Sequence, residues 1–165
     1  MTTTLCTITV SDSRTRETDA GGQLLRGLLE EGGFGLGLHQ VVRDDPQEIQ
    51  QALRRVGGAD AIVVTGGTGI GPRDVTVEAV EPLLTRKLDG FGEAFRRLSW
   101  EQVGARSVLS RALAGTMGGK LVFVLPGSPK AVSLGVKELI VPLLGHALEM
   151  LSGGGHSDAG HRHGQ

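Results

Sequence analysis

The stretch that decides the fold is DAIVVTGGTGIGPRDVT, residues 60–76. It begins with a short and almost wholly apolar run, which is typical of a strand buried on both faces in a parallel sheet. Four glycines follow at once and leave backbone N–H groups unshielded, at positions 66, 67, 69 and 71. In open α/β sheets ligands bind outside the carboxyl ends of the strands, so this loop predicts a ligand-binding edge.

On either side of this stretch, segments with the pattern of a strand alternate with segments whose apolar residues recur at helical spacing. Apolar and β-branched runs predict further strands at 4–10, 36–42 and 121–125. Apolar residues at helical spacing predict helices between them, with a clear face at Ile49, Ala52, Leu53 and Val56. We also expect a short helix at 107–114, and a long one at 131–151 that Pro142 kinks or divides. This alternation predicts an α/β fold with a mostly parallel sheet and helices on both faces.

Length and composition restrict the class of protein. The 165 residues predict one folded domain at 1–151 and a disordered Gly/His tail at 152–165, with His156, His161 and His163. A formal charge of −1 argues against a dedicated nucleic-acid partner. The single Cys6 excludes an internal disulfide and is expected in an aliphatic core, since aromatic residues are only 3%. No signal peptide or membrane span is apparent, so we expect a cytoplasmic protein.

The glycine loop itself has two interpretations. Its N–H groups, with the hydroxyls of Thr65 and Thr68 and the helix that follows, suit a phosphate cradle. It matches neither the dinucleotide-binding G-x-G-x-x-G pattern nor the P-loop pattern. The alternative is that the glycines only allow the strand and helix to pack closely.

Acidic residues follow the loop and the second strand. Asp74 is either a helix cap or a ligand for a magnesium ion that also binds phosphate oxygens. Asp44 and Asp45 precede Pro46 and by themselves resemble a helix cap. If the second strand neighbours the third, these carboxylates approach Asp74, and a pair of them shares the metal.

A third loop, PGSPK at residues 126–130, combines fixed turns with one hydroxyl and one cation. Lys130 at a helix start is unfavourable for the helix dipole, which indicates an anionic partner, although an exposed lysine explains it equally. Arg73 and Arg111 are further candidates for phosphate or carboxylate contact, and the alternative for both is a solvated surface. Glu93 is either part of the site or a carboxylate at a helix start.

Together these motifs resemble the molybdopterin adenylyltransferase family, MogA/MoaB, which is related to the gephyrin G domain. The resemblance spans about residues 4–151, and TGGTG followed by RDVT, with LPGSPKA at the expected distance, is its most specific part. The matching segments are VSD (10–12), Asp44, TGGTG (65–69), RDVT (73–76), GFGEAFR (90–96), LSRA (109–112) and LPGSPKA (125–131). The stretch 90–115 is closer to the MoaB branch.

The resemblance implies a three-layer αβα sandwich and a step of molybdenum cofactor biosynthesis. In that step the terminal phosphate of molybdopterin attacks the α-phosphorus of ATP, giving adenylyl-molybdopterin and pyrophosphate in a Mg²⁺-dependent reaction. It further implies a homotrimer or a hexamer, and transfer of the product to a MoeA-type molybdate-inserting partner.

The same resemblance assigns roles to residues. Asp44 and Asp74 are the implied catalytic and metal-binding pair. The implied nucleotide- and phosphate-binding residues are Ser11, Asp12, Thr65, Gly66, Gly67, Thr68, Gly69 and Glu93. The implied molybdopterin-binding residues are Ser110, Arg111, Pro126, Gly127, Ser128 and Lys130.

Two other functions stay open at this point. Some proteins of the MoaB branch look catalytically silent, so a structural or regulatory partner that binds molybdopterin is one alternative. A CinA-like domain acting on nucleotides is another, although such proteins are usually longer and lack LPGSPKA in this form.

Overall fold

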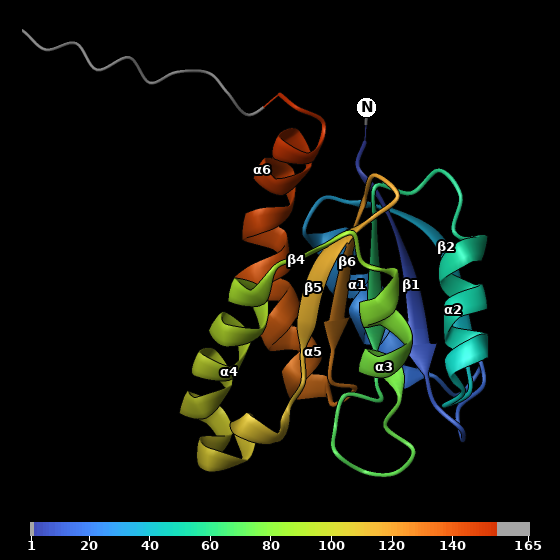
Figure 1. Ribbon diagram of the computed structural model, residues 1–165, viewed down its shortest axis with the longest axis vertical. Coiled ribbons are helices and arrows are strands. Elements are labelled where there is room, and N and C mark those ends of the chain that lie inside the picture. The colour runs from blue at the N-terminus through green and yellow to red at the C-terminus, as the bar shows by residue number, and fades with distance from the viewer. Residues whose placement is uncertain (1, 155–165) are drawn as a thin grey trace, which may run out of the picture.

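A single six-stranded sheet forms the centre of the protein (Figure 1). The computed structural model describes residues 2–154, so the three predicted tail histidines lie outside the described residues. The strand order is β2-β1-β3-β6-β5-β4. The strands are β1 (Thr4–Val10), β2 (Gly35–Val42), β3 (Ala61–Thr65), β4 (Arg86–Lys87), β5 (Leu113–Met117) and β6 (Lys120–Leu125).

The four strands at one side of the sheet are parallel. Ala61 of β3 pairs with Leu5 of β1 and with Leu121 of β6. At the other end of β3, Thr65 pairs with Thr9 and Leu125, so these three strands end at the same edge of the sheet. This edge is at the bottom of Figure 1, where the glycine loop emerges from β3.

Helices cover both faces and confirm the three-layer sandwich. One face carries α1 (Ala20–Glu31), α4 (Asp89–Val103), α5 (Pro129–Gly135) and α6 (Val141–Leu151). The other carries α2 (Pro46–Arg55) and α3 (Thr76–Val80). Cys6 is buried as expected, and the core is mainly aliphatic, with Phe91, Phe95 and Phe123 added on the α1–α6 side.

The segment Pro129–Leu151 is long and apolar enough, by length and composition alone, to cross a membrane. Here it packs along the sheet and buries Val132, Val136, Ile140 and Leu144. A π-helical turn at Val136–Ile140 separates α5 from α6, and Pro142 lies in the first turn of α6. The helix is therefore divided, as the proline predicted, and the irregular turn precedes the ring that lacks an N–H.

The structure differs from the sequence analysis at one predicted helix, at one strand that it missed, and at the condition set for Asp44 and Asp74. Residues 107–114 are not a helix: a 3₁₀ segment, Gly104–Leu109, leads into β5. The short β4 was missed, and β4 and β5 add two antiparallel strands at the far side of the sheet. The second strand does not neighbour the third, because β1 lies between them.

Candidate functional site

The glycine loop is held in a conformation that only glycine adopts readily. Gly66 and Gly67 have φ angles of 95° and 69°, in the left-handed region. A Cβ at Gly66 would lie 2.4 Å from the Val10 carbonyl oxygen, and one at Gly67 would lie 2.1 Å from the Thr76 Oγ1. Close packing therefore explains these two glycines. The same loop still follows a strand and precedes α3, as a phosphate cradle requires.

Three loops from three different strands meet through Asp12. Its Oδ1 accepts a hydrogen bond from the backbone N–H of Asp44 at 3.0 Å, and its Oδ2 accepts one from the Arg73 guanidinium at 2.5 Å. Asp12 thus connects the ends of β1 and β2 with the loop after β3. Asp44 reaches the glycine loop by this route, although β1 separates β2 from β3.

Asp74 folds back over its own loop. Its Oδ2 accepts a hydrogen bond from the backbone N–H of Gly71 at 2.9 Å. The residue before α3 is Val75, and no side chain caps that helix. The helix-cap interpretation of Asp74 is therefore wrong. Asp45, by contrast, caps α2 by accepting from Gln47 N–H at 2.8 Å.

The charges at this edge are unbalanced at Asp44. Burial raises the pKa of Asp44, and the neighbouring carboxylates of Asp12 and Asp74 raise it further. The pKa of Asp12 is lowered, because it accepts the Asp44 N–H bond and pairs with Arg73. A cation bound beside Asp44 would therefore relieve the repulsion among these carboxylates.

Arg111 braces the glycine loop from the side of β5. Its guanidinium donates to the carbonyl oxygen of Gly69 at 3.0 Å and 2.7 Å and to that of Asp74 at 3.1 Å. It also pairs with the Glu78 carboxylate on α3. Arg111 is thus not a solvated surface residue, and most of its donors are used within the protein.

One pocket includes the start of the loop in its wall, and a second reaches the loop through Arg111. The second, of about 510 Å³, lies between α4 and the start of β5 and includes Glu93, Ser110 and Arg111 in its wall. The first, of about 220 Å³, lies where β1, β3 and β6 end. Its walls include Thr9, Ser11, Arg14, Asp19, Thr65, Gly66 and Gly127.

The structure groups the predicted residues differently from the two sets drawn from the sequence. Ser110 and Arg111 share a pocket with Glu93, whereas Gly127 shares one with Ser11, Thr65 and Gly66. Thr68 is buried, and its carbonyl accepts the Arg111 N–H at 3.1 Å. Ser128 caps α5, next to Pro126 and Gly127, and Lys130 is exposed on the first turn of that helix and lines neither pocket.

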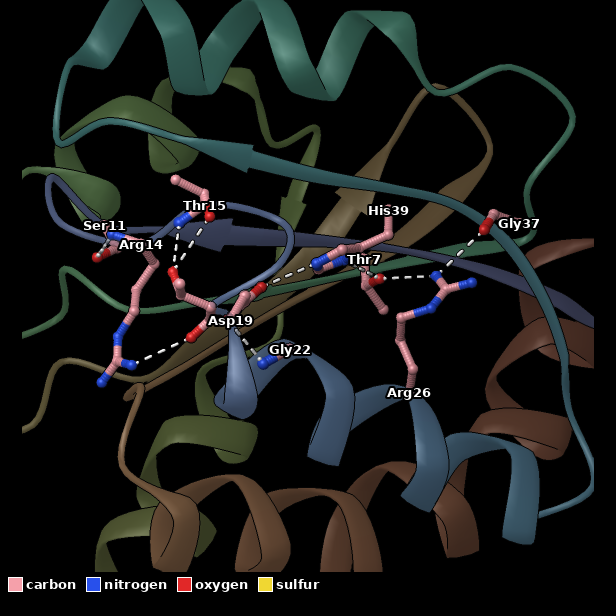
Figure 2. Close-up of polar contacts among 10 residues, drawn as sticks. Thr7, Ser11, Arg14, Thr15, Asp19, Gly22, Arg26, Gly37 and His39 are labelled. Atoms are coloured by element: carbon pink, nitrogen blue, oxygen red, sulfur yellow. Dashed lines mark hydrogen bonds and ion pairs between the residues drawn. The ribbon is translucent and has the colours of Figure 1, made fainter.

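A set of polar residues beside the smaller pocket was missed by the sequence analysis. Figure 2 shows Asp19, at the start of α1, bonded to His39 of β2, which in turn contacts Thr7 of β1. Arg26 on α1 bonds to the same Thr7. No local pattern marks these residues, because they lie on three elements. Asp19 just before a helix was the only signal that the sequence offered.

Fold and site together define an α/β domain whose parallel strands end at a glycine-lined, acidic edge, with one pocket at that edge and another beside Arg111. The family model described as "Probable molybdopterin binding domain" matches residues 6–146. The chain therefore belongs to the molybdopterin-binding domain family that includes MoaB and MogA.

Relatives in sequence and structure agree with this assignment. Molybdenum cofactor biosynthesis protein B of Staphylococcus carnosus is 49% identical over 150 residues, which cover 88% of each chain. A crystal structure of a molybdenum cofactor biosynthesis protein B is 45% identical, with a TM-score of 0.88 over 92% of this chain and 97% of the other. The tungsten cofactor synthesizing protein MoaB from Pyrococcus furiosus is 39% identical, with a TM-score of 0.83 over 91% and 97%.

Proposed function

We propose that this protein is a molybdopterin adenylyltransferase. The terminal phosphate oxygen of molybdopterin attacks the α-phosphorus of ATP. A new P–O bond forms, the bond to the β-phosphate oxygen breaks, and pyrophosphate leaves. The observation that carries the proposal is the convergence of Asp12, Asp44 and Asp74 beside the glycine loop.

Direct transfer suits the residues that are present. Nucleotidyl transfer needs positioning and charge neutralisation more than a covalent nucleophile. The described residues do contain a hydroxyl–imidazole–carboxylate series, Thr7–His39–Asp19. Thr7 is fully buried, however, so its hydroxyl cannot reach a substrate. Two substrates would therefore react with each other.

Magnesium fits the acidic edge by the chemistry of its donors. The described residues contain no cluster of three or more His, Cys, Asp or Glu side chains that could hold a metal alone. Mg²⁺ commonly uses one or two carboxylates and takes its other ligands from phosphate oxygens and water. Asp44 and Asp74 would hold it, and the ion would neutralise phosphate charge. The raised pKa of Asp44 supports this role, since a carboxylate destabilised by its neighbours gains most from a cation.

The remaining parts of the proposal rest on the family. We place the protein in the cytoplasm as a homotrimer or hexamer, and expect it to pass its product to a MoeA-type molybdate-inserting enzyme. A silent MoaB-type partner is the competing function. It would bind molybdopterin without releasing pyrophosphate from ATP.

The test is incubation of the purified protein with ATP, Mg²⁺ and molybdopterin, followed by mass detection of adenylyl-molybdopterin and assay of pyrophosphate. Formation of both products supports the enzyme. Binding of molybdopterin by the folded protein with neither product would contradict the proposal and favour the silent partner.

A further inference from the structure

Four polar side chains form a continuous hydrogen-bonded series behind the smaller pocket (Figure 2). Arg26 donates to the Thr7 hydroxyl at 3.1 Å, and Thr7 lies 2.8 Å from His39 Nδ1. His39 Nε2 lies 2.9 Å from Asp19 Oδ2. The His39 and Asp19 side chains are only 11% and 3% exposed, so water cannot readily replace these bonds.

The two ends of the series have fixed donors and acceptors. Arg26 is always charged and can only donate, so the Thr7 oxygen accepts from it. A carboxylate can only accept, so His39 Nε2, which lies 2.9 Å from Asp19 Oδ2, carries a hydrogen. That Nε2–H donates to the Asp19 carboxylate. The series thus ends with an imidazole N–H that gives a fixed donor to a buried carboxylate.

Asp19 uses its other oxygen on the helix itself. Oδ1 accepts from the backbone N–H of Gly22 at 2.9 Å and so caps the first turn of α1. A Cβ at Gly22 would lie 2.1 Å from Asp19 Oδ2 and 2.8 Å from His39 Cε1. The imidazole and carboxylate are therefore packed directly against the start of α1.

The first turn of α1 is also a wall of the 220 Å³ pocket, which includes Asp19, Ala20 and Gly21. The Thr9 hydroxyl lines the same pocket, is buried, and has no hydrogen-bond partner of normal geometry, although it lies beside Asp19. The Ser11 hydroxyl and the Arg14 guanidinium line the same pocket, and such groups suit a phosphate group of a substrate.

We propose that His39 is a positioning residue. It orients Asp19, and through Asp19 it fixes the first turn of α1 as the wall that receives a substrate phosphate at the end of β1. The substrate part of this inference rests on the proposed adenylyl transfer. The part concerning α1 does not.

Three variants distinguish the effect of the His39 hydrogen-bond donor from the effect of its side-chain volume. His39→Leu keeps much of the volume but removes the Nε2–H donor, whereas His39→Gln keeps a donor at a similar reach. His146→Leu on α6, where the side chain is 68% exposed, is the matched control. Each variant is compared by amide hydrogen exchange at Gly22, by thermal unfolding, and by kcat and KM for ATP.

For His39→Leu we expect about tenfold faster exchange at Gly22, the equivalent of one lost hydrogen bond. We also expect about a tenfold higher KM for ATP with kcat changed by less than about twofold, since ground-state and transition-state binding fall together. His39→Gln should restore both values to within about threefold. The control should leave both unchanged.

Each result decides one part of the inference. Unchanged Gly22 exchange in His39→Leu overturns it outright. Faster exchange and a lower unfolding temperature with unchanged KM would make His39 merely structural. If the unaltered protein makes no product at all, the proposed function fails, while Gly22 exchange still shows whether His39 positions α1.

Discussion

Asp19 and Asp44 are the same residue type at the same edge of one sheet, yet their pKa values move in opposite directions. Burial alone raises the pKa of Asp19, but the nearby Thr9 hydroxyl and the hydrogen bonds from Gly22 and His39 outweigh it, and the pKa falls. Burial also raises the pKa of Asp44, and there the neighbouring carboxylates of Asp12 and Asp74 add to it.

The difference lies in where each carboxylate finds its partners. The two carboxylate oxygens of Asp19 are hydrogen-bonded within the protein, one to an imidazole and one to a backbone N–H. Asp44 donates its backbone N–H to Asp12, but its carboxylate faces two others. A carboxylate that is hydrogen-bonded within the protein stabilises the fold, whereas a carboxylate that faces other carboxylates favours the binding of a cation. The comparison therefore assigns Asp19 to the scaffold and Asp44 to the proposed magnesium site.

The largest expected effect is at Asp74. Asp74→Asn should keep the bond from Gly71 N–H but remove the charge that faces the proposed metal, and should lower kcat by about 100-fold or more. Mass detection of adenylyl-molybdopterin measures it, with Glu31→Gln on α1 as a control. Full activity in Asp74→Asn would remove Asp74 from the catalytic pair while leaving the proposed reaction in place.

Asp19→Asn should instead act on stability. The amide loses the charge and cannot match both the Gly22 N–H and the His39 Nε2–H, so we expect a loss of about 2 kcal/mol in the free energy of unfolding. Because its pKa is lowered, the Asp19 carboxylate stabilises the fold above its ordinary pKa of 3.8, and this stability is lost as pH falls below that value.

Urea unfolding of both proteins between neutral and acid pH checks this sign. The difference in the free energy of unfolding between wild type and Asp19→Asn should be largest at neutral pH and should become smaller in acid. A difference independent of pH would mean that the carboxylate charge does not contribute.

Arg111→Lys tests the brace on the glycine loop. Lysine keeps the charge but cannot bond to Gly69, Asp74 and Glu78 together, so we expect KM for ATP to rise about fivefold. Steady-state kinetics measures this, with Arg54→Lys on the exposed side of α2 as the matched control. Equal KM values for both variants would show that the loop holds its shape without the guanidinium.

The smallest expected effect is at Asp44. Its raised pKa means that the ionised side chain costs stability at neutral pH, a cost relieved as pH falls through its folded pKa. Asp44→Asn without magnesium should therefore be more stable than wild type by less than about 1 kcal/mol, since solvent screens the charges.

Magnesium should reverse this order. Added Mg²⁺ should stabilise wild type more than Asp44→Asn in urea unfolding, because only wild type retains both carboxylates. Equal stabilisation of the two proteins would place the ion elsewhere.

The sequence predicts the centre of this fold better than its periphery. Continuous apolar runs mark β3 and β6, because strands buried on both faces need no alternation, and a run rich in β-branched residues marks β1. β4 has only two residues, and Gly115 interrupts the pattern of β5 where a Cβ would lie 2.4 Å from the Arg86 carbonyl oxygen. The order of the strands in the sheet is also not predictable from the sequence, since no local pattern indicates that β1 lies between β2 and β3.

The candidate site divides in the same way. Motif spacing brings out the glycine loop and Asp74, which follow a buried strand, whereas Asp44 entered the site only through the resemblance to a family. The roles of Arg111 and His39 depend on contacts between elements 42 and 20 residues apart along the chain, which no periodicity records. The resemblance to a family supplied residue types but not the division into two pockets.

The pairing of the central strands also sets an order in time. Met117 and Lys120 join β5 to β6 through a tight turn, so this hairpin closes early. β3 instead pairs with β1 and β6, which lie far away along the chain, as the pairing of Ala61 with Leu5 and Leu121 shows. Pairings between such distant segments form slowly. The sheet edge that carries the proposed binding site is formed by the carboxyl ends of these three strands. During synthesis the protein therefore has no binding site until β6 has emerged and docked, and an intermediate that lacks this strand cannot capture a substrate.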